Sequence, residues 1–346
     1  MRRALQELVQ RHEALRTTFV EQDGRVLQHI APSLDVALPV IDVKDGAPSE
    51  REAEAWSLLH ADARKPFDVE KGPLLRTVLY RWGPGEYLLL LNVHHIVSDG
   101  WTMGVLVREL GALYPALAAG QPSPLPALPM QYADFATWQR DWLQGEALDS
   151  QLGYWRQQLD ADAMLELPTD KPRPPVASTD GARLTVMLPP ALLQSLKSLA
   201  GREGRTLFTL LLSAYQVLLS RYSGQDDVVV GTPIAGRNRS ELEGLIGLFV
   251  NTLALRADLS ADPSFQALMA QVHEVSLGAF AHQEVPFEKL VEALQPERKL
   301  STTPLFQVMF ALQNAPLPPL RVPGLLLEMQ PVDSGTSQVD LTVLAT

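Results

Sequence analysis

Two adjacent histidines, His94 and His95, stand just before Asp99 and Gly100, and this cluster is the part of the sequence best suited to chemistry. Histidine titrates near neutral pH, so an imidazole that faces a cleft can take a proton from an incoming nucleophile. A buried Asp99 would need a cationic partner, and Gly100 would let a ligand approach the backbone closely. Two hydrogen-bonded core histidines beside a turn are the alternative interpretation.

The apolar run before the histidines predicts a strand over residues 87–95 that is buried on both faces. Neighbouring residues of a strand point to opposite faces, so His94 and His95 cannot chelate one metal ion together. The same alternation predicts that only one of the two histidines faces a cleft, and that the other is structural.

The rest of the sequence excludes several classes of protein. It contains no GxGxxG, GxxxxGK[ST], GxSxG or HExxH motif, and it has no cysteine. The formal net charge is −11 with no long basic run, which argues against nucleic-acid binding. The longest apolar tract, Leu207–Leu219, contains polar residues and is too short for a bilayer, which takes about 20 residues. We therefore expect a cytoplasmic protein that binds neither nucleic acid, membrane nor metal.

Periodic apolar residues predict the elements that must position the histidines. Helical spacing predicts a helix over residues 5–15 and another directly after Gly100. Alternating apolar residues predict strands over 75–80 and 184–188. A long apolar helix is expected between a Thr206 cap and Gly224.

The proline-rich stretch Pro168–Gly181 is the best candidate for a domain boundary, because no regular element can cross it. With 346 residues, 46% of them hydrophobic, the chain is long enough for two domains. Strands and helices occur on both sides of this stretch. The sequence therefore predicts a mixed α/β fold with two lobes of similar size, residues 1–168 and 169–346.

The histidine cluster is one of six motifs that follow a known family in order. The stretch HHIVSDG at residues 94–100 matches the pattern HHxxxDG. The other five are RHEALRTTF at 11–19, YADFATW at 132–138, IGLFVNTLALR at 246–256, HQEVPF at 282–287 and STTPLFQVMF at 301–310. Together they resemble the condensation domains of non-ribosomal peptide synthetases, which belong to the chloramphenicol acetyltransferase-like acyltransferases.

The sequence departs from this family at its two ends. The motif expected before residue 11 is missing, and the chain stops at residue 346, where the family continues into further strand and helix. We therefore expect a fragment truncated at both ends, with a C-terminal lobe that is incomplete.

The resemblance implies a V-shaped pseudo-dimer of two acetyltransferase-like lobes with a tunnel between them. Donor and acceptor peptidyl carrier proteins would bring their substrates into this tunnel on phosphopantetheine arms, and no cofactor would be bound directly. The acceptor amine would attack the donor acyl or peptidyl thioester to form an amide. An adenylation domain is the expected neighbour.

The resemblance also assigns roles to individual residues. His95 is the expected catalytic residue, as a general base or by orienting the amine and stabilising charge. Asp99 is expected to form a structural ion pair with an arginine, for which Arg11 is the first candidate and Arg16 the second. The residues expected to support or line the site without doing chemistry are His94, Asp99, Gly100, Arg11, Arg16, Trp101 and Asn251, the last two as tunnel-lining residues.

The sequence favours one subtype of this family and leaves two alternative functions open. The tail of the motif, residues 99–106, resembles domains that join an L-configured donor to an L-acceptor, and the intact histidine pair argues against epimerisation and heterocyclisation domains. A coenzyme A-dependent acyltransferase is a second reading, although the DFGWG motif of its plant-type members is absent. A non-catalytic recruitment domain is a third, but such domains usually carry a degraded histidine motif.

Overall fold

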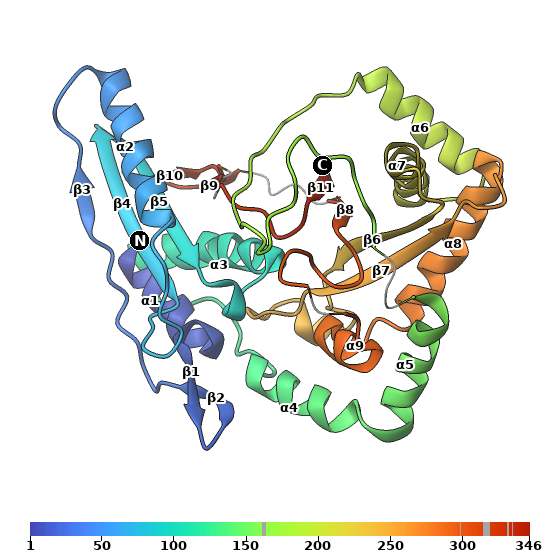
Figure 1. Ribbon diagram of the computed structural model, residues 1–346. Helices are drawn as coiled ribbons and strands as arrows, with labels where there is room; N and C mark the ends of the chain where they lie inside the picture. The colour runs from blue at the N-terminus through green and yellow to red at the C-terminus, as the bar shows by residue number, and fades with distance from the viewer. Residues whose placement is uncertain (161–163, 298, 314–318, 331, 334) are drawn as a thin grey trace. The chain divides into compact units, whose positions relative to one another are not determined.

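The structure, a computed structural model, describes residues 1–346 except 161–163, 298, 314–318, 331 and 334 (Figure 1). The chain forms two compact units. Unit 1 comprises Met1–Arg140, Arg237–Val250 and Leu317–Ser334, and unit 2 comprises Asp141–Gly236, Asn251–Pro316 and Gly335–Thr346. Both units contain helices and strands, which confirms the mixed α/β fold with two lobes.

The units do not divide at residue 168, where the proline-rich stretch placed the boundary. Helix α5 (Gly145–Gln158) precedes that stretch, yet its Leu152 and Trp155 are buried in the core of unit 2. Two later segments also return to unit 1. Prolines mark where regular structure stops, whereas a domain is defined by the core that its side chains share.

Unit 1 is built around a three-stranded sheet in the order β3-β4-β5, with β3 parallel and β5 antiparallel to β4. Its helices are α1 (Arg2–Arg11), α2 (Pro48–Ala63), α3 (Gly100–Ala118) and α4 (Tyr132–Trp142). Its strands are β1 (Thr17–Gln22), β2 (Arg25–Ile30), β3 (Val40–Asp42), β4 (Leu75–Gly83), β5 (Glu86–Val93), β9 (Leu320–Val322) and β10 (Leu325–Leu327). Its 3-10 turns are η1 (Glu13–Arg16), η2 (His95–Val97) and η3 (Ser240–Leu242).

Helices α1 and α3 pack against each other, as their apolar spacing predicts (Figure 1). Leu5 and Leu8 of α1 and Leu106 and Leu110 of α3 are all buried in one cluster. Burial of each such side chain stabilises the fold by about 1.5–3 kcal/mol relative to exposure. This packing fixes α3, the helix that begins at Gly100, the last residue of the histidine motif.

Unit 2 is built around a four-stranded sheet in the order β11-β8-β6-β7. Its strands are β6 (Asp227–Ile234), β7 (Asn251–Asp258), β8 (Val308–Leu312) and β11 (Leu341–Ala345). Besides α5, its helices are α6 (Pro190–Arg202), α7 (Leu207–Ser223), α8 (Phe265–Ala281) and α9 (Phe287–Leu294). Helices α7 and α8 pack on strands β6 and β7 respectively (Figure 1).

Two of the sequence predictions for unit 2 have opposite outcomes. Helix α7 is capped as expected, because the Thr206 hydroxyl accepts from the Thr209 amide at 3.1 Å and Gly224 ends the helix at a φ of 72°. The strand predicted over 184–188 is wrong: this segment is in no sheet, and Leu184 is 87% exposed. Alternating apolar residues form a strand only where a neighbouring strand pairs with them.

Within the described residues, no helix combines the length and the hydropathy that crossing a membrane requires.

Candidate active site

The two histidines do not lie in a strand. Strand β5 ends at Val93, and His94 is the N-terminal cap of the 3-10 turn His95–Val97. The Ser98 hydroxyl and the Val97 amide donate to the His94 carbonyl, both at 3.1 Å. The expectation that strand alternation separates the two rings is therefore wrong, because the tight turn sets their directions instead.

The turn gives the two imidazoles different surroundings. The His94 ring is partly buried, and it lies edge-on to Phe67 with ring centroids 5.8 Å apart. His94 Nδ1 accepts from the Ile96 amide at 3.1 Å, so the proton of a neutral ring is on Nε2. His95 is exposed, and no hydrogen bond to its ring is present within the described part of the chain. Of the two rings, His95 is thus the one open to a substrate, and its catalytic role stays a prediction.

The Asp99 carboxylate is buried and surrounded by donors. Oδ1 accepts from the amide and the hydroxyl of Thr102, both at 3.0 Å. Oδ2 accepts from Arg237 at 2.7 Å and from the Phe249 amide at 3.0 Å. The Arg237 and Asp99 side chains are only 1% and 2% exposed. Since both carboxylate oxygens are occupied by protein donors, Asp99 holds the turn in place and is not free to accept a substrate proton.

Arg237 is the arginine that pairs with Asp99, so the prediction of Arg11 or Arg16 is wrong. Arg11 donates to Glu109 of α3 at 3.1 Å, and His12 lies 2.8 Å from the other oxygen of the same carboxylate. Glu109 is ten residues beyond Asp99 along α3, a rise of about 15 Å. Arg16 instead donates to the carbonyl of Ala31, the residue directly after β2.

Sequence reasoning missed Arg237 because it lies 138 residues from Asp99. The one sequence signal for it was the loop Gly236-Arg237-Asn238-Arg239, which begins two residues after the end of the buried strand β6. The guanidinium also lies 4.2 Å from the centre of the Phe249 ring. Burial lowers the pKa of Arg237, and the hydrogen bond and charge of Asp99 oppose this shift.

A triad of Arg11, His12 and Glu109 links the C-terminal end of α1 to α3, away from the motif at 94–100. Burial raises the pKa of Glu109, but the hydrogen bonds and charges of His12 and Arg11 outweigh burial and hold this pKa below its usual value. Glu109 is therefore ionised near neutral pH and joins the two helices. Arg11 and His12 of the motif at 11–19 are thus both engaged by Glu109 of α3.

The segment 237–250 lies against the first turn of α3 and the start of α4. Tyr132 of α4 donates its hydroxyl to the Leu248 carbonyl at 2.9 Å, and its ring lies 5.0 Å from that of Phe249. A Cβ atom on Gly247 would be 2.2 Å from the Tyr132 ring, so only glycine fits there. The motifs at 132–138 and 246–256 therefore meet beside the histidine motif, which the sequence did not predict.

The remaining predicted site residues have separate surroundings. Gly100 is exposed, and no atom lies within 4 Å of a Cβ built on it, so packing does not require glycine there. Trp101 is 42% exposed and donates to the Glu243 carbonyl at 2.9 Å. Asn251 belongs to unit 2, where its side chain donates to the carbonyls of Gln283 and Val285 at 2.9 and 2.8 Å. A tunnel-lining role for Trp101 and Asn251 stays a prediction.

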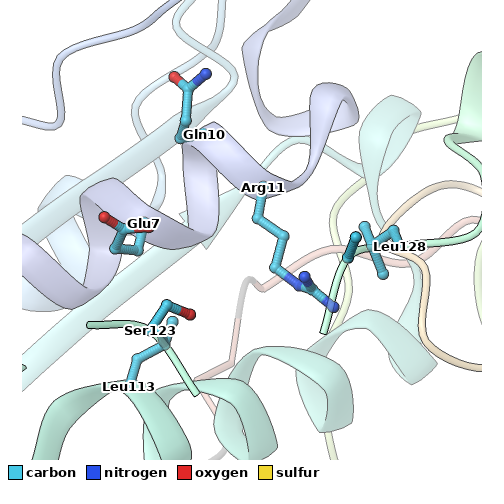
Figure 2. Close-up of a pocket in the computed structure, with 7 residues that line it drawn as sticks. Glu7, Gln10, Arg11, Leu113, Ser123 and Leu128 are labelled. Atoms are coloured by element: carbon cyan, nitrogen blue, oxygen red, sulfur yellow. The ribbon is translucent and has the colours of Figure 1, made fainter. Parts of the chain in front are cut away.

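Neither of two cavities in the structure includes residues of the histidine motif. One, of about 240 Å³, lies in unit 1 between α1 and α3, and Figure 2 shows the Arg11 side chain extending into it from α1. The other, of about 600 Å³, lies in unit 2 and is lined by four acidic residues together with Met164, Gln225 and Lys299. Among the residues that the structure describes, no three histidine or carboxylate side chains are grouped to hold a metal ion.

The chain is similar to proteins of known function over its whole length. A family model described as a condensation domain matches residues 1–343. The chain is 54% identical to a linear gramicidin synthase protein of Brevibacillus parabrevis, over 91% of this chain and 4% of that protein. It is 46% identical to phosphinothricin tripeptide synthetase PhsC of Streptomyces viridochromogenes, over 91% of this chain and 29% of that protein. It thus spans a small part of the relatives that it matches.

Solved structures agree with the sequence comparisons. The X-domain from teicoplanin biosynthesis superposes with a TM-score of 0.88 at 29% identity, over 99% of this chain and 76% of that one. A complex of the X-domain and OxyB gives a TM-score of 0.86 at 30% identity, with coverage of 99% and 74%. The first condensation domain of the calcium-dependent antibiotic synthetase shares the fold at 24% identity, with a TM-score of 0.78 and coverage of 99% and 77%.

Proposed function

The chain belongs to the condensation-domain family of non-ribosomal peptide synthetases, and from this membership we propose that it joins two carrier-bound substrates through an amide bond. The donor is an acyl or peptidyl thioester on the phosphopantetheine arm of one peptidyl carrier protein. The acceptor is an aminoacyl thioester on a second carrier protein. An adjacent adenylation domain would load the acceptor carrier.

The acceptor amine attacks the donor thioester carbonyl, a C–N bond forms, and the C–S bond breaks. The amine loses one proton, which the departing thiolate takes up either through the exposed His95 ring or directly, so atoms and charge balance. His95 acts either as a base or by orienting the amine and stabilising the charge of the tetrahedral intermediate. The observation that carries this proposal is the exposed ring of His95 on a turn whose other polar groups, His94 and Asp99, are already committed to the protein.

We further propose an L-configured donor and an L-configured acceptor. The support for this choice is the tail of the motif, residues 99–106, which resembles that of domains that join an L-configured donor to an L-acceptor.

A second candidate is a non-catalytic domain that recruits a partner enzyme. The specific observation in its favour is the similarity to an X-domain that was solved in a complex with OxyB. Against it stands the complete HHxxxDG motif with an exposed second histidine.

The test is to mix the purified chain with a panel of aminoacyl-loaded donor and acceptor carrier proteins and to detect the dipeptidyl product by mass spectrometry. Parallel reactions offer the donor as a coenzyme A thioester, or as the D-aminoacyl carrier protein. We expect product from L-donor carrier proteins at a rate well above that of either alternative. A preference for the coenzyme A donor would establish the free-standing acyltransferase instead. No product with any donor, together with stable binding of a partner enzyme, would establish the recruitment domain.

A further inference from the structure

One buried hydroxyl joins the start of α3 to the segment 237–250. Thr102 is fully buried, and its Oγ1 lies 3.0 Å from Asp99 Oδ1 and 3.3 Å from the Gly247 carbonyl. The Asp99 amide donates to the same oxygen at 3.2 Å. The hydroxyl proton can be directed at the carboxylate or at the carbonyl, while the oxygen accepts from the amide. Thr102 thus contacts two stretches that are 145 residues apart, beside the bonds that Asp99 accepts from Arg237 and from the Phe249 amide.

This junction is close to His95 through the backbone. Only Ser98 separates the turn His95–Val97 from Asp99, and the Ser98 amide donates to the His95 carbonyl at 3.2 Å. A shift of the Asp99 backbone is therefore passed to the residue that carries the exposed imidazole.

On the side of segment 237–250, the junction is closely packed against Tyr132. Gly247 lies against the Tyr132 ring with no space for even a methyl group. The next carbonyl, that of Leu248, accepts from the Tyr132 hydroxyl at 2.9 Å. If the Thr102 hydroxyl were lost, the Gly247 carbonyl would keep the Arg237 guanidinium, which donates to it at 3.5 Å, but would lose this link to α3.

We propose that Thr102 is a positioning residue for His95. Its hydroxyl and amide orient the Asp99 carboxylate between α3 and segment 237–250, and this sets the turn that presents the imidazole. The effect on rate rests on the proposed amide-forming function, whereas the effect on the His95 ring does not.

Unit 2 offers a matched control for the loss of a buried threonine hydroxyl. Thr209 is the third residue of α7, as Thr102 is the third residue of α3. Thr209 is 2% exposed, and its hydroxyl lies 2.9 Å from that of the capping Thr206. Valine at either position has the shape of threonine and removes the hydroxyl. Thr209→Val therefore measures the loss of unfolding free energy when a buried threonine loses only its hydroxyl contact with the helix cap.

The experiment compares Thr102→Val, Thr102→Ser and Thr209→Val with the wild-type chain. Urea unfolding gives the folded fraction, and single-turnover assays with loaded carrier proteins give the rate per folded molecule. NMR gives the titration curve of the His95 ring, which is identified as the signal that is lost in His95→Gln. We expect both valine variants to be destabilised, and Thr102→Val at least as much as Thr209→Val, because the Thr102 hydroxyl makes more contacts. Only Thr102→Val should lose rate, by about tenfold or more, because small misplacements of reacting groups are costly. Thr102→Ser should recover at least half of the wild-type rate.

The NMR readout keeps the test independent of the proposed function. A His95 titration curve that is changed in Thr102→Val, but not in Thr209→Val, supports the positioning role even if no variant forms an amide. An unchanged curve in Thr102→Val overturns it. Equal rates per folded molecule for the two valine variants, or failure of serine to restore the rate, also overturn it.

Discussion

Replacing Arg237 with alanine tests the core of the site, because it leaves the Asp99 carboxylate buried without its cation. Breaking a buried ion pair in this way costs about 3–5 kcal/mol of unfolding free energy. Three donors to Asp99 remain, two from Thr102 and one from the Phe249 amide, so we expect the lower end, about 3 kcal/mol. Asp99→Ala should cost about 1 kcal/mol more, since it also removes the N-terminal cap of α3.

The control is Arg256→Ala in unit 2. Arg256 pairs with Asp227 at 2.8 Å, but the two side chains are 34% and 37% exposed. Solvent-exposed pairs contribute only about 0–1 kcal/mol, because water screens them. Urea unfolding followed by circular dichroism at pH 7 measures the three variants against the wild-type chain. If Arg237→Ala costs no more than Arg256→Ala, the Asp99–Arg237 pair does not hold the site and the reasoning is refuted.

Two further changes test neighbouring features. Gly247→Ala should destabilise the chain by about 1–3 kcal/mol or more, because its methyl group would overlap the Tyr132 ring. Gly244→Ala is the control: no atom lies within 4 Å of its Cβ, so it should be nearly neutral in the same unfolding assay. Equal costs would contradict the close approach of segment 237–250. Glu109 has a lowered pKa in the folded chain, so its contribution is complete above the ordinary carboxyl pKa of 4.5 and is lost as the pH falls through the folded value. The stability difference between wild type and Glu109→Gln should therefore be constant above about pH 4.5 and shrink as the pH falls below it. A difference that does not change with pH would show that the charge of Glu109 does not contribute.

Local sequence patterns predicted the helices that carry the site. The apolar spacing of α1 and α3 and the caps of α7 each depend on residues that are close in the sequence. They can therefore be predicted without knowledge of the fold. The position of α3 directly after Gly100 follows from the same pattern and is confirmed. The histidine motif itself was also readable, because its residues are adjacent in the chain.

The partners of these residues could not be read in the same way. Arg237 reaches Asp99 from a loop 138 residues away, and Gly247 reaches Tyr132 across 115 residues, so no local pattern encodes either contact. Strand alternation also gave a wrong prediction for the directions of the His94 and His95 rings. The strand ends at Val93, directly before the pair, and a 3-10 turn follows. The segment 184–188 alternates like a strand, but it pairs with no strand among the residues that the structure describes.

The measurement that tests the central claim most directly is amide formation by His95→Ala and His94→Ala, beside the unfolding of both variants. The His95 ring is exposed, so His95→Ala should fold normally, while the rate of amide formation falls by about 10²–10⁴-fold. His94→Ala loses the hydrogen bond from Ile96 and the contact with Phe67, so it should lose about 1–3 kcal/mol of stability and keep a rate per folded molecule nearer to wild type. A near-normal rate for His95→Ala, or a stable His94→Ala without activity, would contradict the assignment of His95 as the residue that acts on the amine.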